Sequence, residues 1–175
     1  MPVQGTTPRA TFLTSPIFAM GESIPGEKGL RINEAATRAR AGLLNILSAL
    51  TMFILYVSPE SNPIAYVAPY VIFDMTMAAL FGLTPLSPSG LIGTAITLKA
   101  KPVWKPTQPK RFAWSLGALM GMACLAFWWM ALPNVWLYAV LGVCFMLTWL
   151  EAVLGFCVGC WMYDKLFGCE PCQPD

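Results

Sequence analysis

Histidine is absent from this chain of 175 residues, and charged residues make up only 11% of it, against 57% hydrophobic. Without imidazole the chain has no Ser-His-Asp triad, no histidine-ligated haem and no Cys₂His₂ zinc site. A soluble domain carries about 25% charged residues, so a chain with so few cannot cover its surface as a water-soluble monomer. The net charge of +2 is also too small to indicate nucleic-acid binding. The composition therefore predicts a membrane protein.

Four apolar stretches are long enough to cross a bilayer, which takes about 20 residues of helix. The connections within the first and the second pair of spans are short, so each pair is expected to form an antiparallel hairpin. The predicted fold class is thus an all-α integral membrane protein with four transmembrane helices in two hairpins. The spans are expected at about 41–57, 64–83, 112–132 and 135–156.

The basic residues are unevenly distributed along the chain. Ten of the eleven Lys and Arg lie before the first span or between the second and third, and the two short turns contain none. Because positive residues stay on the cytoplasmic side, both termini and the middle loop are predicted to be cytoplasmic. The expected parts are a flexible extension (1–32), a membrane domain (33–163) with a cytoplasmic loop (84–111), and a cysteine-containing tail (164–175).

A CxxC pair, Cys157 and Cys160, follows the fourth span. If that helix continues, both thiols lie on one face, close enough for a disulfide or a shared metal. The dipole at a helix C-terminus does not lower a thiol pKa, so this placement by itself does not predict an activated thiolate. The alternative is that these small side chains, with Gly155 and Gly159, let the helix pack closely on a neighbour.

A second pair, Cys169 and Cys172, follows eight residues later and completes a C-x2-C-x8-C-x2-C array. Four cysteines suffice for a tetrahedral zinc or an iron–sulfur site, although the central gap is short for a four-cysteine zinc site. The competing interpretation is a dithiol relay, in which one pair attacks a substrate and the other resolves it. The two cysteines inside the spans, Cys124 and Cys144, are expected to be small buried hydrophobic residues.

Two acidic residues, Asp74 and Glu151, lie inside predicted spans. Placing a carboxylate there is costly, so each is expected to face the bundle interior and to be protonated or bonded to Ser, Thr or backbone. On an ideal helix Glu151 points away from the face of the first CxxC pair. A proton or substrate path and a structural clasp are the two interpretations of these acids. The arginines near enough to reach Glu151 are Arg38, Arg40 and Arg111.

Three segments carry a resemblance to a known family: RINEAATRARAG at 31–42, KP…PKRFA at 105–113 and EAVLGFCVGCWMY at 151–163. Together they resemble the bacterial membrane family known as domain of unknown function 4395. The last segment is the most specific, since it joins an acidic residue, a glycine and the CxxC. The resemblance implies a small protein of the bacterial inner membrane, associated with thiol and sulfur chemistry, and it implies no mechanism.

Three functions follow from these features. The leading hypothesis is thiol–disulfide or sulfur-transfer redox at the first CxxC pair, with the second pair as resolving thiols or metal co-ligands and a thiol or sulfur carrier protein as partner. The second is a non-catalytic accessory subunit of a larger membrane complex, because the chain lacks an acid/base or nucleophile constellation. The third is a small transporter that uses Asp74 and Glu151.

Overall fold

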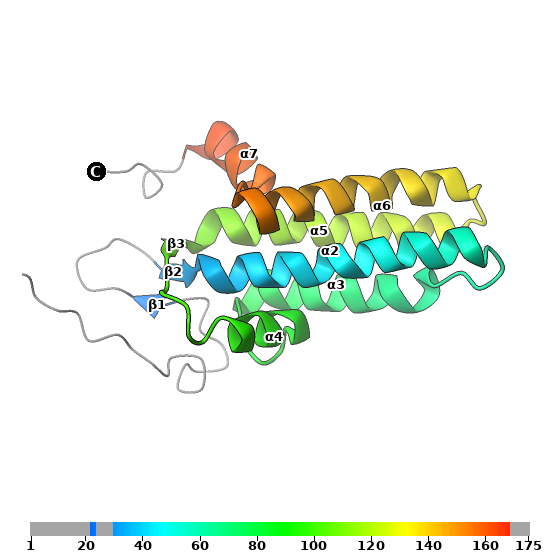
Figure 1. Cartoon of the computed structure of the whole chain (residues 1–175). Coiled ribbons are helices and arrows are strands. Elements are labelled where there is room, and N and C mark those ends of the chain that lie inside the picture. Colours follow the sequence, from blue (N-terminus) through cyan, green and yellow to red (C-terminus); the bar gives the residue numbers. More distant parts are fainter. Residues whose placement is uncertain (1–21, 24–29, 169–175) are drawn as a thin grey trace, which may run out of the picture.

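Four long helices form the body of the molecule in the computed structural model, which describes residues 22–23 and 30–168 (Figure 1). Each is long and apolar enough to cross a bilayer, so the prediction of an all-α chain with four spans is confirmed. They are α2 (Glu34–Val57), α3 (Ile64–Phe81), α5 (Thr107–Trp129) and α6 (Asn134–Trp149), and α6 continues as the π-helical turn η1 (Leu150–Leu154).

The first helix begins seven residues before the expected span. Asn33 caps it by accepting a hydrogen bond from the backbone N–H of Ala35 at 3.0 Å, and Glu34 places a negative charge in its first turn. The expected loop at 84–111 holds the helix α4 (Pro88–Ile96) and the first residues of α5. Capping and local pairing thus extend regular structure well beyond the apolar runs.

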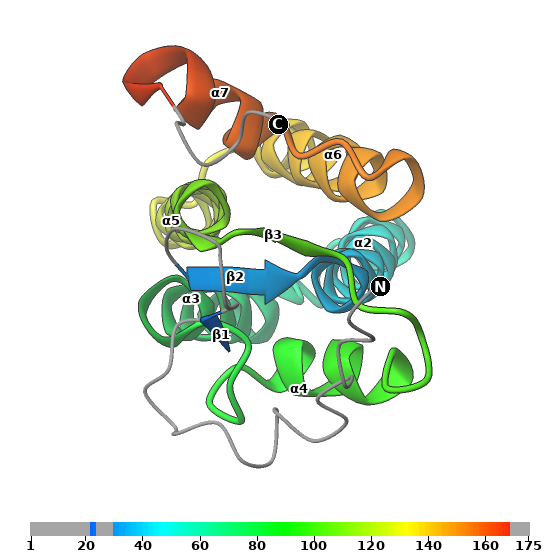
Figure 2. The ribbon, with the colours of Figure 1, turned by 90° about the vertical axis from the view of Figure 1, so that its left-hand side faces the viewer.

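Three short strands, which the sequence pattern did not predict, form an antiparallel sheet in the order β1-β2-β3. Its strand β2 leads directly into α2 and its strand β3 into α5, so pairing Ile32 with Lys105 fixes the starts of these two helices side by side. Figure 2 shows β2 and β3 lying across one end of the bundle. The strands are β1 (Glu22–Ser23), β2 (Leu30–Asn33) and β3 (Trp104–Pro106).

The last helix, α7 (Val158–Phe167), lies at the same end of the bundle as the sheet and α4 (Figure 1); we call this the α7 end. The helix α2 packs on α6, α3 packs on α5, and α7 packs on α5. One buried apolar cluster, around Met75 and Trp114, lies among α2, α3 and α5. A second, around Leu55 and Leu137, contains Cys124, which is buried as expected, whereas Cys144 is half-buried.

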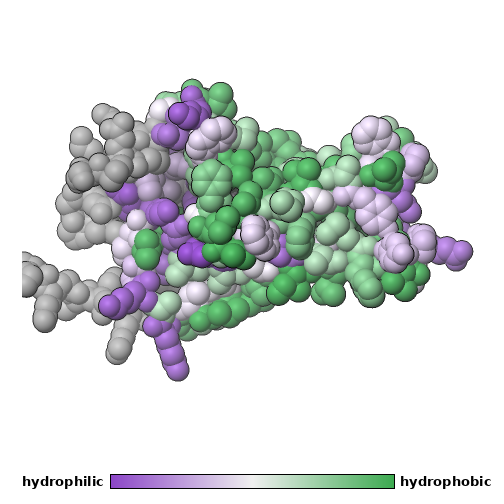
Figure 3. All heavy atoms as spheres, turned by 45° about the horizontal axis from the view of Figure 1, so that its top comes forward, coloured by the Kyte–Doolittle hydropathy of each residue, from purple (hydrophilic) through white to green (hydrophobic). Residues whose placement is uncertain are grey.

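The outer surface of the four helices is apolar. Figure 3 shows hydrophobic residues along the bundle and hydrophilic ones gathered towards the α7 end. Exposing such a surface to water costs about 25 cal/mol per Å², so it indicates a lipid-facing surface and a membrane protein. The exposed aromatic residues at the opposite end match those of a membrane interface: Tyr56, Tyr66, Trp129 and Trp136.

Candidate functional site

The fourth spanning helix ends before the first CxxC pair, so the expectation of one continuous helix through both cysteines is wrong. After the π-helical turn η1, Gly155 adopts a left-handed conformation with φ of +67°, and its N–H closes onto the carbonyl of Leu150. A glycine in this conformation is a common helix terminator, because it has no Cβ to clash. The chain then turns, and Cys157 begins α7.

Arg38 holds this break in place from α2. Its guanidinium donates to the carbonyl of Ala152 at 3.2 and 3.1 Å and to that of Val153 at 2.8 Å. Carbonyls at the end of a helix lack helical partners and need such donors. A Cβ on Gly155 would lie 3.3 Å from the same guanidinium. Arg38, which was expected to reach Glu151, therefore caps the helix end instead.

Cys157 is the N-cap of α7. Its Sγ accepts a hydrogen bond from the backbone N–H of Cys160 at 3.3 Å, and both cysteines are free thiols. The positive end of a helix dipole and free backbone N–H groups favour a thiolate, as in CxxC motifs of the thioredoxin type. The pair was expected at a helix C-terminus, where the dipole acts in the opposite sense, and the break at Gly155 is the reason for the difference.

A buried ion pair lies beside these thiols. Lys110 Nζ, from the first turns of α5, contacts Glu151 Oε1 at 2.6 Å, and the two side chains are 3% and 15% exposed. Both charges act on the CxxC thiols, and Glu151 lines the same cavity as Cys157. Glu151 was expected to point away from the cysteines and to be protonated or bonded to Ser, Thr or backbone, with three arginines near enough to reach it. The first expectation is wrong because the helix breaks at Gly155, and the second because Lys110 on α5 reaches the carboxylate.

The two thiols differ in acidity. A hydrogen bond from the Cys160 thiol lowers the pKa of Cys157, and the charge of Lys110 and the Cys160 N–H lower it further, against the opposing effects of burial and Glu151. The bond that Cys160 donates to Cys157, together with burial, raises the pKa of Cys160. Cys157 is therefore suited to be the attacking thiolate, and Cys160 retains its proton.

Gly159, inside the CxxC motif, sets the distance between α7 and α5. A Cβ at this position would lie 2.6 Å from the Cβ of Ala113, which no real pair of side chains tolerates. The close-packing interpretation of the motif therefore applies to Gly159, whereas Gly155 serves the turn. The same contact brings the thiols towards the helix that carries Lys110, so packing and chemistry depend on one glycine.

A family model described as Domain of unknown function (DUF4395) matches residues 32–167. The chain belongs to this family. The match includes the four spanning helices, the Lys110–Glu151 pair and both thiols of the first CxxC pair, and it ends before Cys169. No curated protein and no solved structure matches the chain.

Asp74, the other acidic residue predicted inside a span, lies away from the thiols, and its carboxylate is bonded to four groups of the DUF4395 domain. Its carboxylate, fully buried, pairs with Arg40 at 2.7 Å and accepts bonds from the Ser87 hydroxyl at 2.9 Å, the Ser89 N–H at 2.9 Å and the Ser89 hydroxyl. The serines fit the expectation, but Arg40 was expected near Glu151. Its guanidinium also lies 5.1 Å from the ring centroid of Trp114. These contacts tie together α2, α3 and α4.

The second CxxC pair, Cys169 and Cys172, lies outside the described residues, so the four-cysteine array stays a prediction. Within residues 22–23 and 30–168, no group of three or more His, Cys, Asp and Glu could hold a metal ion. The intramembrane thiol of Cys144 lies 3.8 Å from the sulfur of Met120, in the cavity that Cys157 also lines. In the part of the chain that the structure describes, the candidate site therefore consists of the thiols of Cys157 and Cys160 and the Lys110–Glu151 ion pair.

Proposed function

We propose that this DUF4395 protein is a membrane thiol–disulfide oxidoreductase. The observation that carries the proposal is the position of Cys157, which caps α7 beside the buried pair of Lys110 and Glu151. A nucleophilic cysteine requires a lowered pKa, a partly accessible position and a resolving thiol within reach. Cys157 has these features, with Cys160 as its neighbour.

The proposed reaction is an exchange of two electrons. The Cys157 thiolate attacks a substrate disulfide, forming a mixed disulfide and releasing one substrate thiolate. Cys160 then loses its proton and attacks Sγ of Cys157, which forms the Cys157–Cys160 disulfide and releases the second substrate thiolate. Glu151, the acidic side chain among the described residues that lines this cavity, accepts the proton of Cys160, and Lys110 stabilises the thiolate.

The proposal includes a partner and an orientation. A thiol or sulfur carrier protein is the substrate, and Cys169 and Cys172 serve as a second, resolving pair. The site faces the cytoplasm of a bacterial cell, because the exposed lysines of the α7 end follow the positive-inside rule. A zinc or iron–sulfur centre at the four C-terminal cysteines is the competing use of the same thiols, and stoichiometric metal in the purified protein would favour it.

Two other functions compete with this proposal. The bonds that Asp74 makes to Arg40, Ser87 and Ser89 favour a structural clasp over a transport path through this carboxylate. An accessory role in a larger membrane complex predicts a stable stoichiometric partner after purification in gentle detergent. The oxidoreductase predicts reactive thiols in the protein purified alone.

A redox titration tests the proposal. The variant in which Cys124, Cys144, Cys169 and Cys172 are replaced by Ala keeps only the first CxxC pair. It is equilibrated in dithiothreitol buffers of graded oxidation state, and its free thiols are counted by maleimide labelling and mass spectrometry. We expect two thiols to disappear together as one two-electron couple. If both thiols remain reduced even in buffer that contains only oxidised dithiothreitol, the proposal is contradicted.

A further inference from the structure

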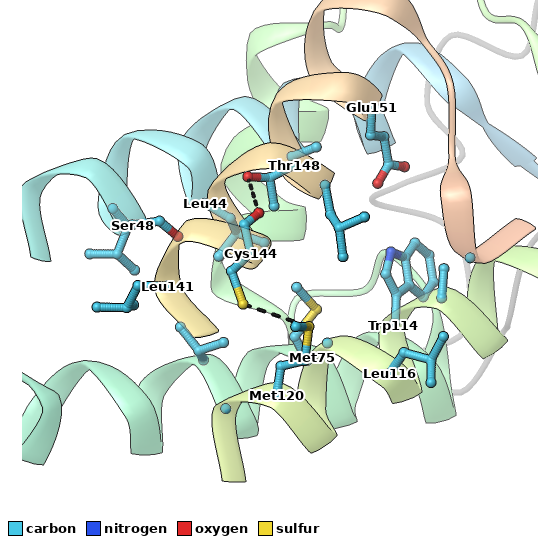
Figure 4. Close-up of a pocket in the computed structure, with 18 of the residues that line it drawn as sticks. Leu44, Ser48, Met75, Trp114, Leu116, Met120, Leu141, Cys144, Thr148 and Glu151 are labelled. Carbon is cyan, nitrogen blue, oxygen red and sulfur yellow. Dashed lines mark hydrogen bonds between the residues drawn. The ribbon is translucent and has the colours of Figure 1, made fainter. Parts of the chain in front are cut away.

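A cavity of about 150 Å³ lies between α2, α3, α5 and α6 and extends to the CxxC site. Figure 4 shows Glu151 and Trp114 at one end of it and Ser48 and Leu141 at the other. Its walls are mostly aliphatic side chains, methionine and cysteine, and Cys157 is one of the residues that line it. The redox-active thiol is thus in contact with an apolar space inside the membrane domain.

The volume of the cavity limits the size of the ligand that it can hold. An engineered apolar cavity of about 150 Å³ stays free of water and binds benzene, so this one has room for a single six-membered ring. A tricyclic cofactor is too large, and a polar peptide disulfide would lose its hydration on entering apolar walls. One wall is α6, whose Leu141, Cys144 and Leu147 line the cavity, while Val143 and Met146 of the same helix are exposed on the lipid-facing surface. A single helix thus separates the cavity from the bilayer.

The Ser48 hydroxyl is a hydrogen-bond donor in the wall of the cavity. Ser48 lines the cavity from α2, and its side chain makes no hydrogen bond to any other described residue. Figure 4 shows the hydroxyl directed into the space, at the end opposite Glu151. Ser48 is half-buried, so its hydroxyl is available to donate to an acceptor on a ligand in the cavity. An acceptor group on a ligand that lies along the cavity takes this bond, while the other end of the cavity brings the ligand next to Cys157.

We propose that this cavity binds the ring of a lipid-soluble quinone, which accepts the electrons of the Cys157–Cys160 pair. This inference rests on the proposed oxidoreductase function, taken in its reverse direction, and names the electron acceptor. Two substrate thiols reduce the Cys157–Cys160 disulfide by the same exchange, and the quinone then oxidises the pair again. In the net reaction the S–H bonds of both cysteines break and one S–S bond forms. Two electrons and two protons pass to the ring, and its two C=O groups become C–OH groups. Where Cys157 is already a thiolate, the second proton comes from water at the α7 end.

The test uses the full chain in lipid nanodiscs with its thiols reduced and a ubiquinone analogue with a short alkyl tail as the probe. The fully substituted ring does not form stable adducts with thiols. We expect one quinol for every two thiols lost in the wild-type protein and none in the Cys157→Ser variant. Wild-type protein whose couple titrates in dithiothreitol buffers but does not reduce the quinone would overturn the inference and leave the proposed function standing. A couple that does not titrate would overturn the proposed function itself.

A pair of matched substitutions locates the site. Ser48→Leu fills the cavity, whereas Ser115→Leu makes the same change at an exposed position of α5. We expect Ser48→Leu to slow quinone reduction by about tenfold or more, a loss of at least about 1.4 kcal/mol, and Ser115→Leu to leave it unchanged. Both should keep the titration in dithiothreitol buffers. Equal rates in the two variants would overturn the placement of the ring. If Ser48→Leu fails to fold, Ser48→Ala takes its place, with weaker quinone binding expected and unchanged binding contradicting the site.

Discussion

The backbone N–H of Cys160 donates a hydrogen bond to Sγ of Cys157 at 3.3 Å, so Cys157 caps the helix that it begins. This bond exists because the preceding helix ends at Gly155 and a new one starts at Val158, with Cys157 as its N-cap. Beside the thiols, Lys110 and Glu151 form a buried ion pair whose two charges act on Cys157 in opposite senses. Substitutions of Lys110 and of Glu151 are therefore expected to shift the pKa of Cys157 in opposite directions.

Replacing either member of the ion pair should shift the acidity of Cys157. Lys110→Met removes a charge that lowers the pKa of Cys157, and Glu151→Gln removes one that raises it. The rate of alkylation by iodoacetamide follows the thiolate fraction, so its midpoint should move to higher pH in the first variant and to lower pH in the second. In the wild-type protein the midpoint of this rate should lie at a lower pH than that of an ordinary thiol, because the pKa of Cys157 is lowered.

The measurement uses a variant in which the other cysteines are replaced, so that Cys157 is the thiol that reacts. Labelling of Cys157 is followed by mass spectrometry of the peptide that contains it. Lys101→Met, at an exposed position, serves as the charge control. Shifts of the same sign for Lys110→Met and Glu151→Gln, or a shift of equal size for the control, would show that the ion pair does not set the acidity of Cys157.

The left-handed conformation of Gly155 should make this glycine far less replaceable than a glycine within a helix. Gly155→Ala places a Cβ in a conformation that costs about 1–2 kcal/mol for an L-residue, against the Arg38 guanidinium. Gly142→Ala is the matched control, since nothing lies within 4 Å of a Cβ there and alanine favours the helix by up to about 1 kcal/mol. Unfolding in mixed micelles measures both, and equal stability of the two variants would contradict the assigned turn.

The bonds of Asp74 predict a loss of stability. Asp74→Ala leaves the guanidinium of Arg40 buried without its partner, and removing one member of a buried ion pair costs about 3–5 kcal/mol. Glu60→Gln, in the exposed turn after α2, should change the unfolding free energy little. Denaturation of the two variants in graded sodium dodecyl sulfate gives the comparison. An Asp74→Ala protein as stable as the Glu60→Gln control would argue against a clasp.

The spans were predictable because a bilayer demands long apolar helices, and composition alone reveals these. The helix break was not, because the fourth span was extended as an ideal helix and Gly155 was interpreted as a packing residue. A glycine just past the last apolar residues is a known stop signal that could have located the break. The Lys110–Glu151 pair joins residues 41 positions apart, and such contacts depend on helix packing. The strands β2 and β3 are too short for a periodic pattern to reveal them.

Trapping of a mixed disulfide tests the central claim, that Cys157 attacks and Cys160 resolves. The two variants Cys157→Ser and Cys160→Ser are incubated with glutathione disulfide, and the adduct is read by intact-protein mass spectrometry. In each variant Cys124, Cys144, Cys169 and Cys172 are also replaced by Ala. We predict that Cys160→Ser accumulates a glutathione adduct on Cys157, whereas Cys157→Ser stays largely unmodified. Equal adduct formation at the two positions, or a faster reaction at Cys160, would contradict the account.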